Sequence, residues 1–200
     1  MGKELCAVDV YTASIPQSIK MVEVLPRLRQ EQIENTTHPG LKLQRYYVWK
    51  LLEYALHHSL GLEMNNLHFS RTETGKWTCE ECFFSLSHTQ DAVAVAVSGK
   101  PVGVDLECTD RLIRPNLAEK ILTPEEKLQL SQQDLDRNLL KMWCAKESLF
   151  KADSNPVFCP HKLSADRAKV QILHLGEKTY CLAVAADNLN ALTVHESILL

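Results

Sequence analysis

The sequence has no hydrophobic run that approaches the roughly twenty apolar residues of a membrane-spanning helix. It also lacks a large net charge, because the formal charge at pH 7 is only −3. This balance excludes a protein whose whole surface is built for nucleic acid, so a site for a polyanion must be a local basic cluster. The N-terminus carries the acidic Glu4 and no apolar core of a signal peptide. We therefore expect a cytoplasmic protein that binds neither membranes nor nucleic acid.

The cysteines do not form the pattern of a disulfide framework. There are seven, an odd number, scattered through the chain, which is typical of free thiols in a reducing compartment. Cys79 and Cys82 form a C-x-x-C motif with two glutamates between them. A structural zinc site would need two further ligands, and no second C-x-x-C motif or histidine pair supplies them. The sequence therefore predicts neither a metal nor a redox role for this pair.

A short alternating segment at residues 102–107 carries two carboxylates. As a strand, it places two valines and a leucine on one face and Gly103, Asp105 and Glu107 on the other. The backbones of the two acidic residues would then lie about 6–7 Å apart, so their oxygens could converge on one hard cation. Taken alone, the segment is explained as well by a strand with one solvated face.

A helical segment about forty residues later carries a second polar set. Trp143, Glu147 and Lys151 recur every four positions, so they project from one helix face. A surface pair of Glu147 with Lys151, worth only about a few tenths of a kcal/mol, would explain this spacing on its own.

Together these blocks resemble the 4'-phosphopantetheinyl transferase superfamily. The matching residues are Val-Gly-Val-Asp-Leu-Glu at 102–107, Trp-Cys-Ala-Lys-Glu-Ser-Leu-Phe-Lys at 143–151, and Phe-Ser-Leu-Ser-His upstream at 84–88. The resemblance runs from about residue 40 to about residue 185, and the chain length is similar to that of the Sfp-type branch, whose members look like two fused copies of a smaller unit.

The resemblance implies an activity and its partners. The protein would transfer the 4'-phosphopantetheine group of coenzyme A to a serine of an apo acyl or peptidyl carrier protein and release 3',5'-ADP. Two alternatives stay open: a coenzyme A-binding homologue without transferase activity, and a Mg²⁺-dependent hydrolase that uses water on the pyrophosphate. Because the apparent duplication lets one chain form the whole cleft, we expect a monomer.

Candidate catalytic and metal-binding residues follow from the same blocks. Three hard oxygen ligands from Asp105, Glu107 and Glu147 suit Mg²⁺ beside a pyrophosphate. Glu147, directly or through a metal-bound water, is also the predicted base for the attacking serine. Lys151, one helical turn further on, would stabilise the departing nucleotide. Trp143 is expected to anchor the helix in the core rather than to line the site.

Five residues are predicted to contact coenzyme A. The resemblance implies that Arg45, on a helix, approaches the nucleotide, and that His88 contacts the 3'-phosphate beside Ser87. Lys76, in a turn, would contact a phosphate, although tryptophan follows it here where the family often has proline. Lys146 lies about 100° from the Glu147 face of its helix, which favours the adenosine-side phosphate or the surface.

Periodicity and turn signals predict the elements. Expected helices cover residues 20–35, 41–60, 124–133 and 136–152, and expected strands cover 4–11, 67–70, 83–88, 91–97, 102–107, 170–175, 179–186 and 192–198. Thr123 and Glu126 form a capping box, and Gly61 ends a helix. Residues 98–101 are predicted to turn one strand into a hairpin with the carboxylate strand. The alanine face of residues 91–97 is expected beneath a helix.

The order of a helix followed by a strand pair occurs twice. We therefore predict an α+β fold of two pseudo-symmetric α/β subdomains, each a small, mainly antiparallel sheet packed on a long helix. The boundary is expected near residue 100, with residues 1–100 as the N-terminal subdomain. Residues 101–200 would form the C-terminal subdomain that carries the metal-binding carboxylates.

Overall fold

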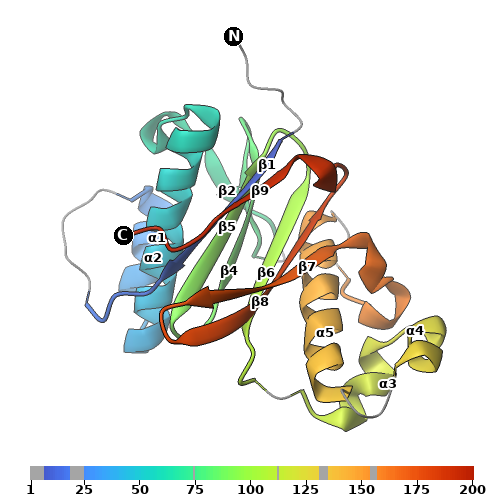
Figure 1. The fold of residues 1–200 in the computed structure, drawn as a ribbon. Helices are drawn as coiled ribbons and strands as arrows, with labels where there is room; N and C mark the ends of the chain where they lie inside the picture. Colours follow the sequence, from blue (N-terminus) through green and yellow to red (C-terminus); the bar gives the residue numbers. More distant parts are fainter. Residues whose placement is uncertain (1–6, 19–24, 74, 112, 131–134, 154–156) are drawn as a thin grey trace.

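Two sheets packed against each other form the centre of the molecule, and a long helix covers the outer face of each (Figure 1). The structure, a computed structural model, describes residues 7–18, 25–73, 75–111, 113–130, 135–153 and 157–200. The strands are β1 Val8–Ser14, β2 Phe69–Arg71, β3 Trp77–Cys79, β4 Phe83–His88, β5 Ala92–Ser98, β6 Val102–Cys108, β7 Lys169–Leu175, β8 Lys178–Ala186 and β9 Leu192–His195. The helices are α1 Arg27–Glu34, α2 Pro39–Ala55, α3 Ala118–Ile121, α4 Pro124–Gln129 and α5 Leu135–Ala152. This arrangement confirms the predicted α+β class.

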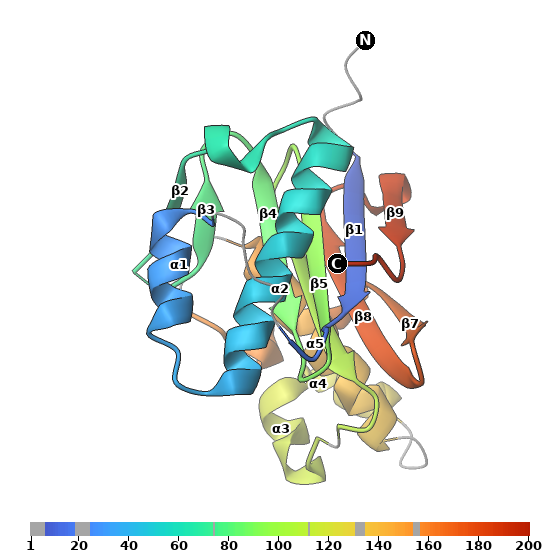
Figure 2. The ribbon, with the colours of Figure 1, turned by 90° about the vertical axis from the view of Figure 1, so that its left-hand side faces the viewer.

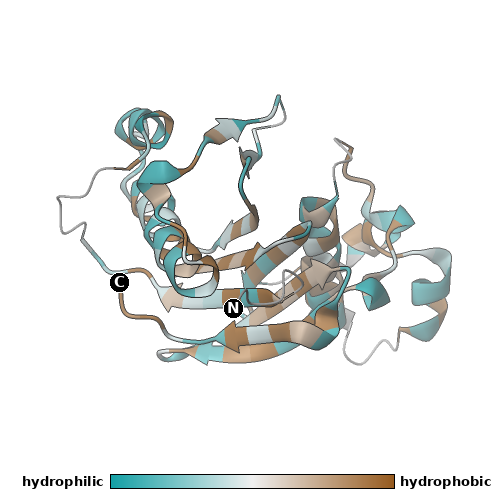
Figure 3. Cartoon of the chain, turned by 90° about the horizontal axis from the view of Figure 1, so that it is seen from above, coloured by the Kyte–Doolittle hydropathy of each residue, from teal (hydrophilic) through white to brown (hydrophobic). Residues whose placement is uncertain are grey.

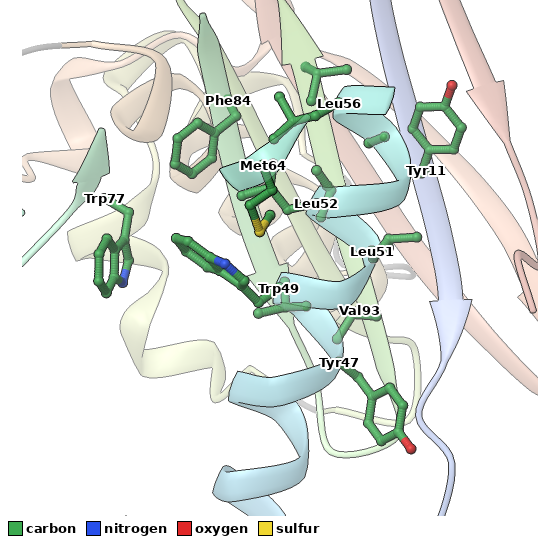
Figure 4. Packing of buried hydrophobic residues seen from close by; sticks show 14 of the residues in the cluster. Tyr11, Tyr47, Trp49, Leu51, Leu52, Leu56, Met64, Trp77, Phe84 and Val93 are labelled. Carbon is green, nitrogen blue, oxygen red and sulfur yellow. The ribbon is translucent and has the colours of Figure 1, made fainter. Parts of the chain in front are cut away.

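The first sheet packs its valine face on α2. Its strand order is β4-β5-β1-β9, and α2 lies across β4, β5 and β1 (Figure 2). Helix α2 continues into a π-helical turn and ends at Gly61, whose φ of 65° is a left-handed conformation that glycine adopts without strain. The core beneath α2 is aromatic: Trp49 packs edge-on to Trp77 and Phe84 (Figure 4). These large side chains fill the space between α2 and the valine face of the sheet.

The alanine face of β5 packs on the second sheet, not on a helix as expected. Ala92, Ala94 and Ala96 join one buried cluster with Val104 and Leu106 of β6. Small side chains on one sheet therefore allow the other sheet to approach closely. Hydrophobic residues, brown in Figure 3, recur along the strands that lie between the two helix layers.

The predicted hairpin from β5 into β6 is wrong. Strand β6 pairs antiparallel with β8, from Val102 opposite Ala186 onward, and starts a second sheet of order β6-β8-β7. The outer edge of β6 instead meets side chains of β4. The backbone N–H of Val104 donates to Ser85 Oγ at 3.0 Å, and that of Leu106 donates to Ser87 Oγ at 3.1 Å. These bonds satisfy edge donors that a hairpin with β5 would have paired.

The second sheet brings its own helix to backbone contact. A Cβ atom added at Gly103 would lie 1.8 Å from the carbonyl oxygen of Ser148 and 2.6 Å from the nitrogen of Ala152. The contact between β6 and α5 therefore requires glycine at this position. Buried Cys144 and Ala145 of α5 pack against the same sheet. This contact brings Asp105, two residues after Gly103, close to Glu147, the residue before Ser148.

The last strand returns to the first sheet. Strand β9 pairs parallel with β1, and the N–H of Ile198 donates to the carbonyl of Thr12 at 2.9 Å. The chain passes from the first sheet to the second between β5 and β6, and its C-terminal segment crosses back to the first sheet. Among the described residues, no helix is both long and apolar enough to span a membrane.

Several local predictions are confirmed. Both hydrogen bonds of the capping box between Thr123 and Glu126 are present, and Gly176, with a φ of 61°, turns β7 into β8. The predicted first strand and first helix begin in residues 1–6 and 19–24, which lie outside the described residues. Their described parts form β1 and α1.

Candidate active site

Asp105 is the buried centre of the site. It projects from β6 toward α5 and is only 5 % exposed. Its Oδ1 atom accepts hydrogen bonds from Ser87 Oγ at 2.9 Å and from Lys151 Nζ at 2.7 Å. Its Oδ2 atom is buried and has no hydrogen-bond partner among the described residues. A buried carboxylate oxygen without a donor costs about 1–3 kcal/mol or more, so this atom is a strong candidate ligand for a cation.

Glu107 lies two residues further along β6 on the same face. Burial raises the pKa of its carboxyl, and the nearby charge of Asp105 adds to this shift. A hydrogen-bonded ion pair with Arg111 and a hydrogen bond with the Trp143 side chain lower the pKa in opposition. Trp143 is half-buried and also packs against Phe158. It therefore touches the acidic site as well as the core, which corrects the prediction of a core anchor alone.

Glu147 faces these two carboxylates from α5. It is half-buried, and burial raises the pKa of its carboxyl, as do the charges of Asp105 and Glu107, while Lys151 and Arg111 lower it. It makes no hydrogen bond or ion pair with another described residue. The helix therefore brings a third carboxylate, with its oxygens free, to the junction.

The three carboxylates do not form a closed ligand cage. Among the described residues, their oxygens do not all lie within 4.8 Å of one another. Lys151 holds one oxygen of Asp105, and Arg111 holds one oxygen of Glu107. The donor set still fits Mg²⁺, because it offers hard oxygens, the unpartnered Asp105 Oδ2 and the free Glu147 carboxylate. Repulsion among the three negative charges would fall when a cation binds.

Lys151 links the carboxylates to β4 and β6. Its Nζ atom donates to Asp105 Oδ1, to the carbonyl of Val104 at 3.1 Å and to Ser87 Oγ at 3.3 Å. These three partners fix the ammonium group beside the acidic centre. It lies one turn beyond Glu147 on the same helix face, as the four-residue spacing predicts.

Ser87 is placed differently from the prediction of a coenzyme A contact. The residue is buried, and its hydroxyl donates to Asp105 and accepts from the Leu106 N–H and from Lys151. A hydroxyl has one donor and two acceptor positions, so all three are in use. The structure therefore makes Ser87 a residue that orients Asp105 and Lys151.

A basic group lies beside the acidic one. His88 is exposed at the end of β4, yet desolvation by surrounding atoms lowers its pKa to about 4, and the charges of Lys151, Arg29 and Arg45 lower it further. Arg45, from α2, donates to Thr36 Oγ1 at 2.5 Å. Two predicted nucleotide contacts, Arg45 and His88, thus share one positive region.

Arg29 belongs to this region and was missed by the sequence analysis. It is 4 % exposed, and its guanidinium lies 5.1 Å from the centre of the Trp49 ring and donates to the backbone carbonyl of Arg45. Burial lowers its pKa to about 9, with further lowering by the charges of Arg45 and Arg71. Its position four residues before the buried Ile33, on the same helix face, was the available signal.

The other two predicted contacts are tied to the protein itself. Lys76 Nζ donates to the carbonyl of Lys151 at 2.5 Å, at the C-terminal end of α5, which leaves its predicted phosphate contact a prediction. Lys146 is fully buried and forms an ion pair with Glu126 at 2.5 Å and a bond to the Ile121 carbonyl at 2.6 Å. The predicted nucleotide contact of Lys146 is therefore corrected to a structural role.

The family comparison matches the second half of the chain. Residues 101–192 match the model of the 4'-phosphopantetheinyl transferase superfamily. The 4'-phosphopantetheinyl transferase gsp of Aneurinibacillus migulanus is 29 % identical over 105 residues, which cover 50 % of this chain and 44 % of that protein. The 4'-phosphopantetheinyl transferase psf-1 of Bacillus pumilus is 29 % identical over 107 residues, which cover 50 % and 46 %.

The chain thus spans about half the length of the curated relatives it matches. The segment matched by the family model includes Asp105, Glu107, Glu147 and Lys151. These matches confirm the resemblance to the superfamily that the motifs indicate.

Proposed function

We propose that the protein transfers the 4'-phosphopantetheine group of coenzyme A to a serine of an apo acyl or peptidyl carrier protein, with release of 3',5'-ADP. The observation that carries the proposal is the meeting of Asp105, Glu107 and Glu147 beside Lys151 at the junction of β6 and α5. We further propose that the protein acts as a monomer in the cytoplasm.

Mg²⁺ would be held by Asp105, through its unpartnered Oδ2, with Glu107 and Glu147. When bound, the ion neutralises charge on the pyrophosphate oxygens. Mg²⁺ commonly keeps several waters and takes the remaining positions from substrate phosphates, which fits a site open to the coenzyme.

Glu147 is the proposed general base. Its carboxylate lies beside the other two carboxylates and makes no hydrogen bond or ion pair with another described residue, so an oxygen that does not hold the ion would be available to take up the serine proton. The serine oxygen then bonds to the phosphorus of the phosphopantetheine phosphate, and the bond from that phosphorus to the bridging oxygen breaks. The electron pair leaves with 3',5'-ADP, and the ammonium of Lys151 stabilises the charge that develops there. Ser87 keeps both Asp105 and Lys151 in place.

The positive region beside β4 is the proposed site for the nucleotide. His88 and Arg45 would contact the 3'-phosphate, and the buried Arg29 adds positive charge behind them. An anion bound there would offset the repulsion between the positive charges of Arg29 and Arg45. We propose Lys76 as a further phosphate contact once its bond to the end of α5 is exchanged for the ligand.

Transfer is tested by mass spectrometry of the carrier. The protein, coenzyme A and Mg²⁺ are incubated with a panel of apo acyl and peptidyl carriers, and a carrier that the protein serves is expected to gain the mass of one phosphopantetheine group. Coenzyme A binding without any gain would favour the non-catalytic homologue. Metal-dependent release of 3',5'-ADP without a carrier would favour the hydrolase.

Two variants connect the activity to the site. Glu147→Gln should lower transfer at least about 1,000-fold while the fold is kept, because base and ligand are lost together. Glu125→Gln, an exposed residue of α4, is the matched control and should transfer normally. Asp105→Ala should lose activity together with the response to Mg²⁺, and activity with an unchanged Mg²⁺ response would place the ion elsewhere.

A further inference from the structure

Both carboxylates of β6 are paired with a cation of the protein itself, but the two cations are held differently. Lys151 donates to Asp105 and to two further acceptors on β4 and β6, and 25 % of its side chain is exposed. Arg111 donates to Glu107, and 52 % of its side chain is exposed. Within the described part of the chain, Glu107 is the only hydrogen-bond partner of the Arg111 side chain. Lys151 is therefore fixed by several partners, whereas Arg111 is held by one.

The backbone that carries Arg111 is anchored on both sides of the turn after β6. The N–H of Arg111 donates to the carbonyl of Cys108 at 3.0 Å. In the same turn, the backbone N–H and the hydroxyl of Thr109 both donate to the carbonyl of Thr179 in β8 at 3.0 Å. The guanidinium can thus change its partner by side-chain rotation alone, while β6 and its carboxylates stay in place.

The position of Arg111 makes it a competitor of any cation at the carboxylates. Its charge lowers the pKa of both Glu107 and Glu147, against the larger effect of burial. A Mg²⁺ ion on these oxygens would be repelled by the guanidinium unless the guanidinium moves away. Since half of the Arg111 side chain is exposed, solvent screens its ion pair with Glu107, and exchange of the partner costs little.

We propose that Arg111 is a substrate-binding residue that Mg²⁺ releases: it neutralises Glu107 before the ion binds, leaves Glu107 when the ion arrives, and then contacts the pyrophosphate of coenzyme A. Arginine suits this exchange, because its planar guanidinium forms paired hydrogen bonds with carboxylate and phosphate groups alike. The pyrophosphate would join the ion at the same carboxylates, so the released guanidinium meets a new anionic partner there. The inference rests on the proposed function, because that function supplies both ligands.

The exchange couples the binding of the two ligands. Without Mg²⁺, Arg111 stays on Glu107 and contributes nothing to coenzyme A binding. With Mg²⁺, it adds charge-assisted hydrogen bonds to the pyrophosphate. Part of the coupling therefore passes through Arg111, and by linkage coenzyme A strengthens Mg²⁺ binding by the same factor.

Calorimetry of the whole chain and of Arg111→Gln tests the exchange without any carrier protein. Mg²⁺ alone should bind about fivefold more tightly to the variant, because no internal cation competes for Glu107. Coenzyme A in saturating Mg²⁺ should bind about tenfold more weakly to the variant, whereas in EDTA it should bind both proteins equally. Circular dichroism confirms the fold. A merely structural role of Arg111 would not change the two affinities in opposite directions.

Two further variants separate the ion pair from the charge alone. Arg114→Gln, at an exposed position of the same connection, removes an equal charge and is the matched control. Both ligands should bind it as they bind the unchanged chain. Arg111→Lys keeps the charge but lacks the paired donors, so it should recover only part of the coenzyme A affinity.

The outcomes distinguish this inference from the proposed function. The inference is overturned if Arg111→Gln binds Mg²⁺ no more tightly than the unchanged chain, or if its loss of coenzyme A affinity is the same in Mg²⁺ and in EDTA. Absence of Mg²⁺ binding to the unchanged chain would overturn both. If the opposite binding changes are seen and no carrier gains mass, the role of Arg111 is supported and only the transfer activity fails.

Discussion

Each of the two sheets packs on one long helix, but the side chains between helix and sheet differ in size. We call the first sheet with α2 and the second sheet with α5 the two halves of the molecule. Under α2, valines of β5 and aromatic residues such as Trp49 separate helix and sheet. Under α5, Gly103 and Ala183 allow the helix backbone to touch the strand. The close approach places Glu147 and Lys151 beside Asp105. Side-chain size beneath the helix thus decides which half can bring charged groups together.

The charges of the two halves also differ. The α1–α2 side contributes Arg29 and Arg45, whereas the α5 side contributes carboxylates. Between them, β4 offers Ser87 to the acidic group and His88 to the basic group. A ligand with an anionic end and a metal-bound pyrophosphate fits this division, because each half supplies one sign of charge.

Widening the contact under α5 should have the largest effect. Gly103→Ala places a Cβ atom 1.8 Å from a backbone oxygen that cannot rotate away, so β6 and α5 must separate. We expect the free energy of unfolding to fall by about 4 kcal/mol, measured by urea denaturation.

Gly176→Ala is the control for the glycine substitution. Its added Cβ meets no atom within 4 Å, and only its positive φ opposes alanine. A loss of about 1 kcal/mol is expected there. Equal losses in the two variants would show that close packing does not distinguish the α5 half.

Two lysines of α5 separate stability from activity. Lys146→Met leaves the buried Glu126 without its cation and should lower the free energy of unfolding by about 3 kcal/mol, with activity per folded molecule retained. Lys151→Met should lower the transfer rate at least about 100-fold with a smaller loss of stability, because its ammonium is partly exposed. A stable Lys146→Met variant with weakened coenzyme A binding would restore the original assignment of Lys146.

Local pattern predicted much of this structure. The alternation in β6 correctly placed Gly103 and Asp105 on one face, and four-residue spacing placed Glu147 and Lys151 together. These signals are local, since strand and helix geometry fixes which neighbours in the sequence share a face. The meeting of strand and helix itself came from the resemblance to a family rather than from periodicity.

Long-range pairing was not predictable in the same way. Strand β6 pairs with β8, although about seventy residues separate the two strands in the chain. Nothing in residues 98–101 distinguishes a connection to a second sheet from a hairpin turn. The partners of Lys146 and Ser87 likewise come from other elements. The role of a polar residue depends on such distant partners. Because the sequence does not show them, both residues were predicted to contact coenzyme A.

Removing the buried positive charge of Arg29 should weaken coenzyme A binding on the α2 side of the molecule. Arg29→Met keeps apolar volume beside Trp49 but removes the donor to the Arg45 carbonyl and one positive charge near His88. Coenzyme A should bind about tenfold more weakly by calorimetry, and dephospho-coenzyme A less so. The pKa of His88, followed by NMR, should rise, which a purely structural loss would not produce.

Arg27→Met provides the control on the same helix. Its side chain is 91 % exposed and, within the described part of the chain, forms an ion pair with Glu31 alone, so binding and the pKa of His88 should not change. If Arg29→Met weakened the binding of coenzyme A and of dephospho-coenzyme A equally, the 3'-phosphate would not bind in this region.

The smallest effect is the pH dependence of stability in the acidic half. Burial raises the pKa of Glu147, so the folded chain binds a proton where the unfolded chain has lost it. The free energy of unfolding should therefore fall as pH rises above the ordinary glutamate pKa of about 4.3. His88 has the opposite sign: with its pKa lowered to about 4, stability falls as pH drops below about 6.5.

Because the two contributions oppose each other, the informative quantity is the difference between the unchanged chain and Glu147→Gln. The variant should lose the decrease at rising pH and keep the His88 contribution. Excess Mg²⁺ should remove the same decrease from the unchanged chain, because the ion binds the ionised carboxylates. Identical pH profiles of the two proteins without Mg²⁺ would show that the carboxyl of Glu147 does not interact with the carboxylates of Asp105 and Glu107 in the folded chain.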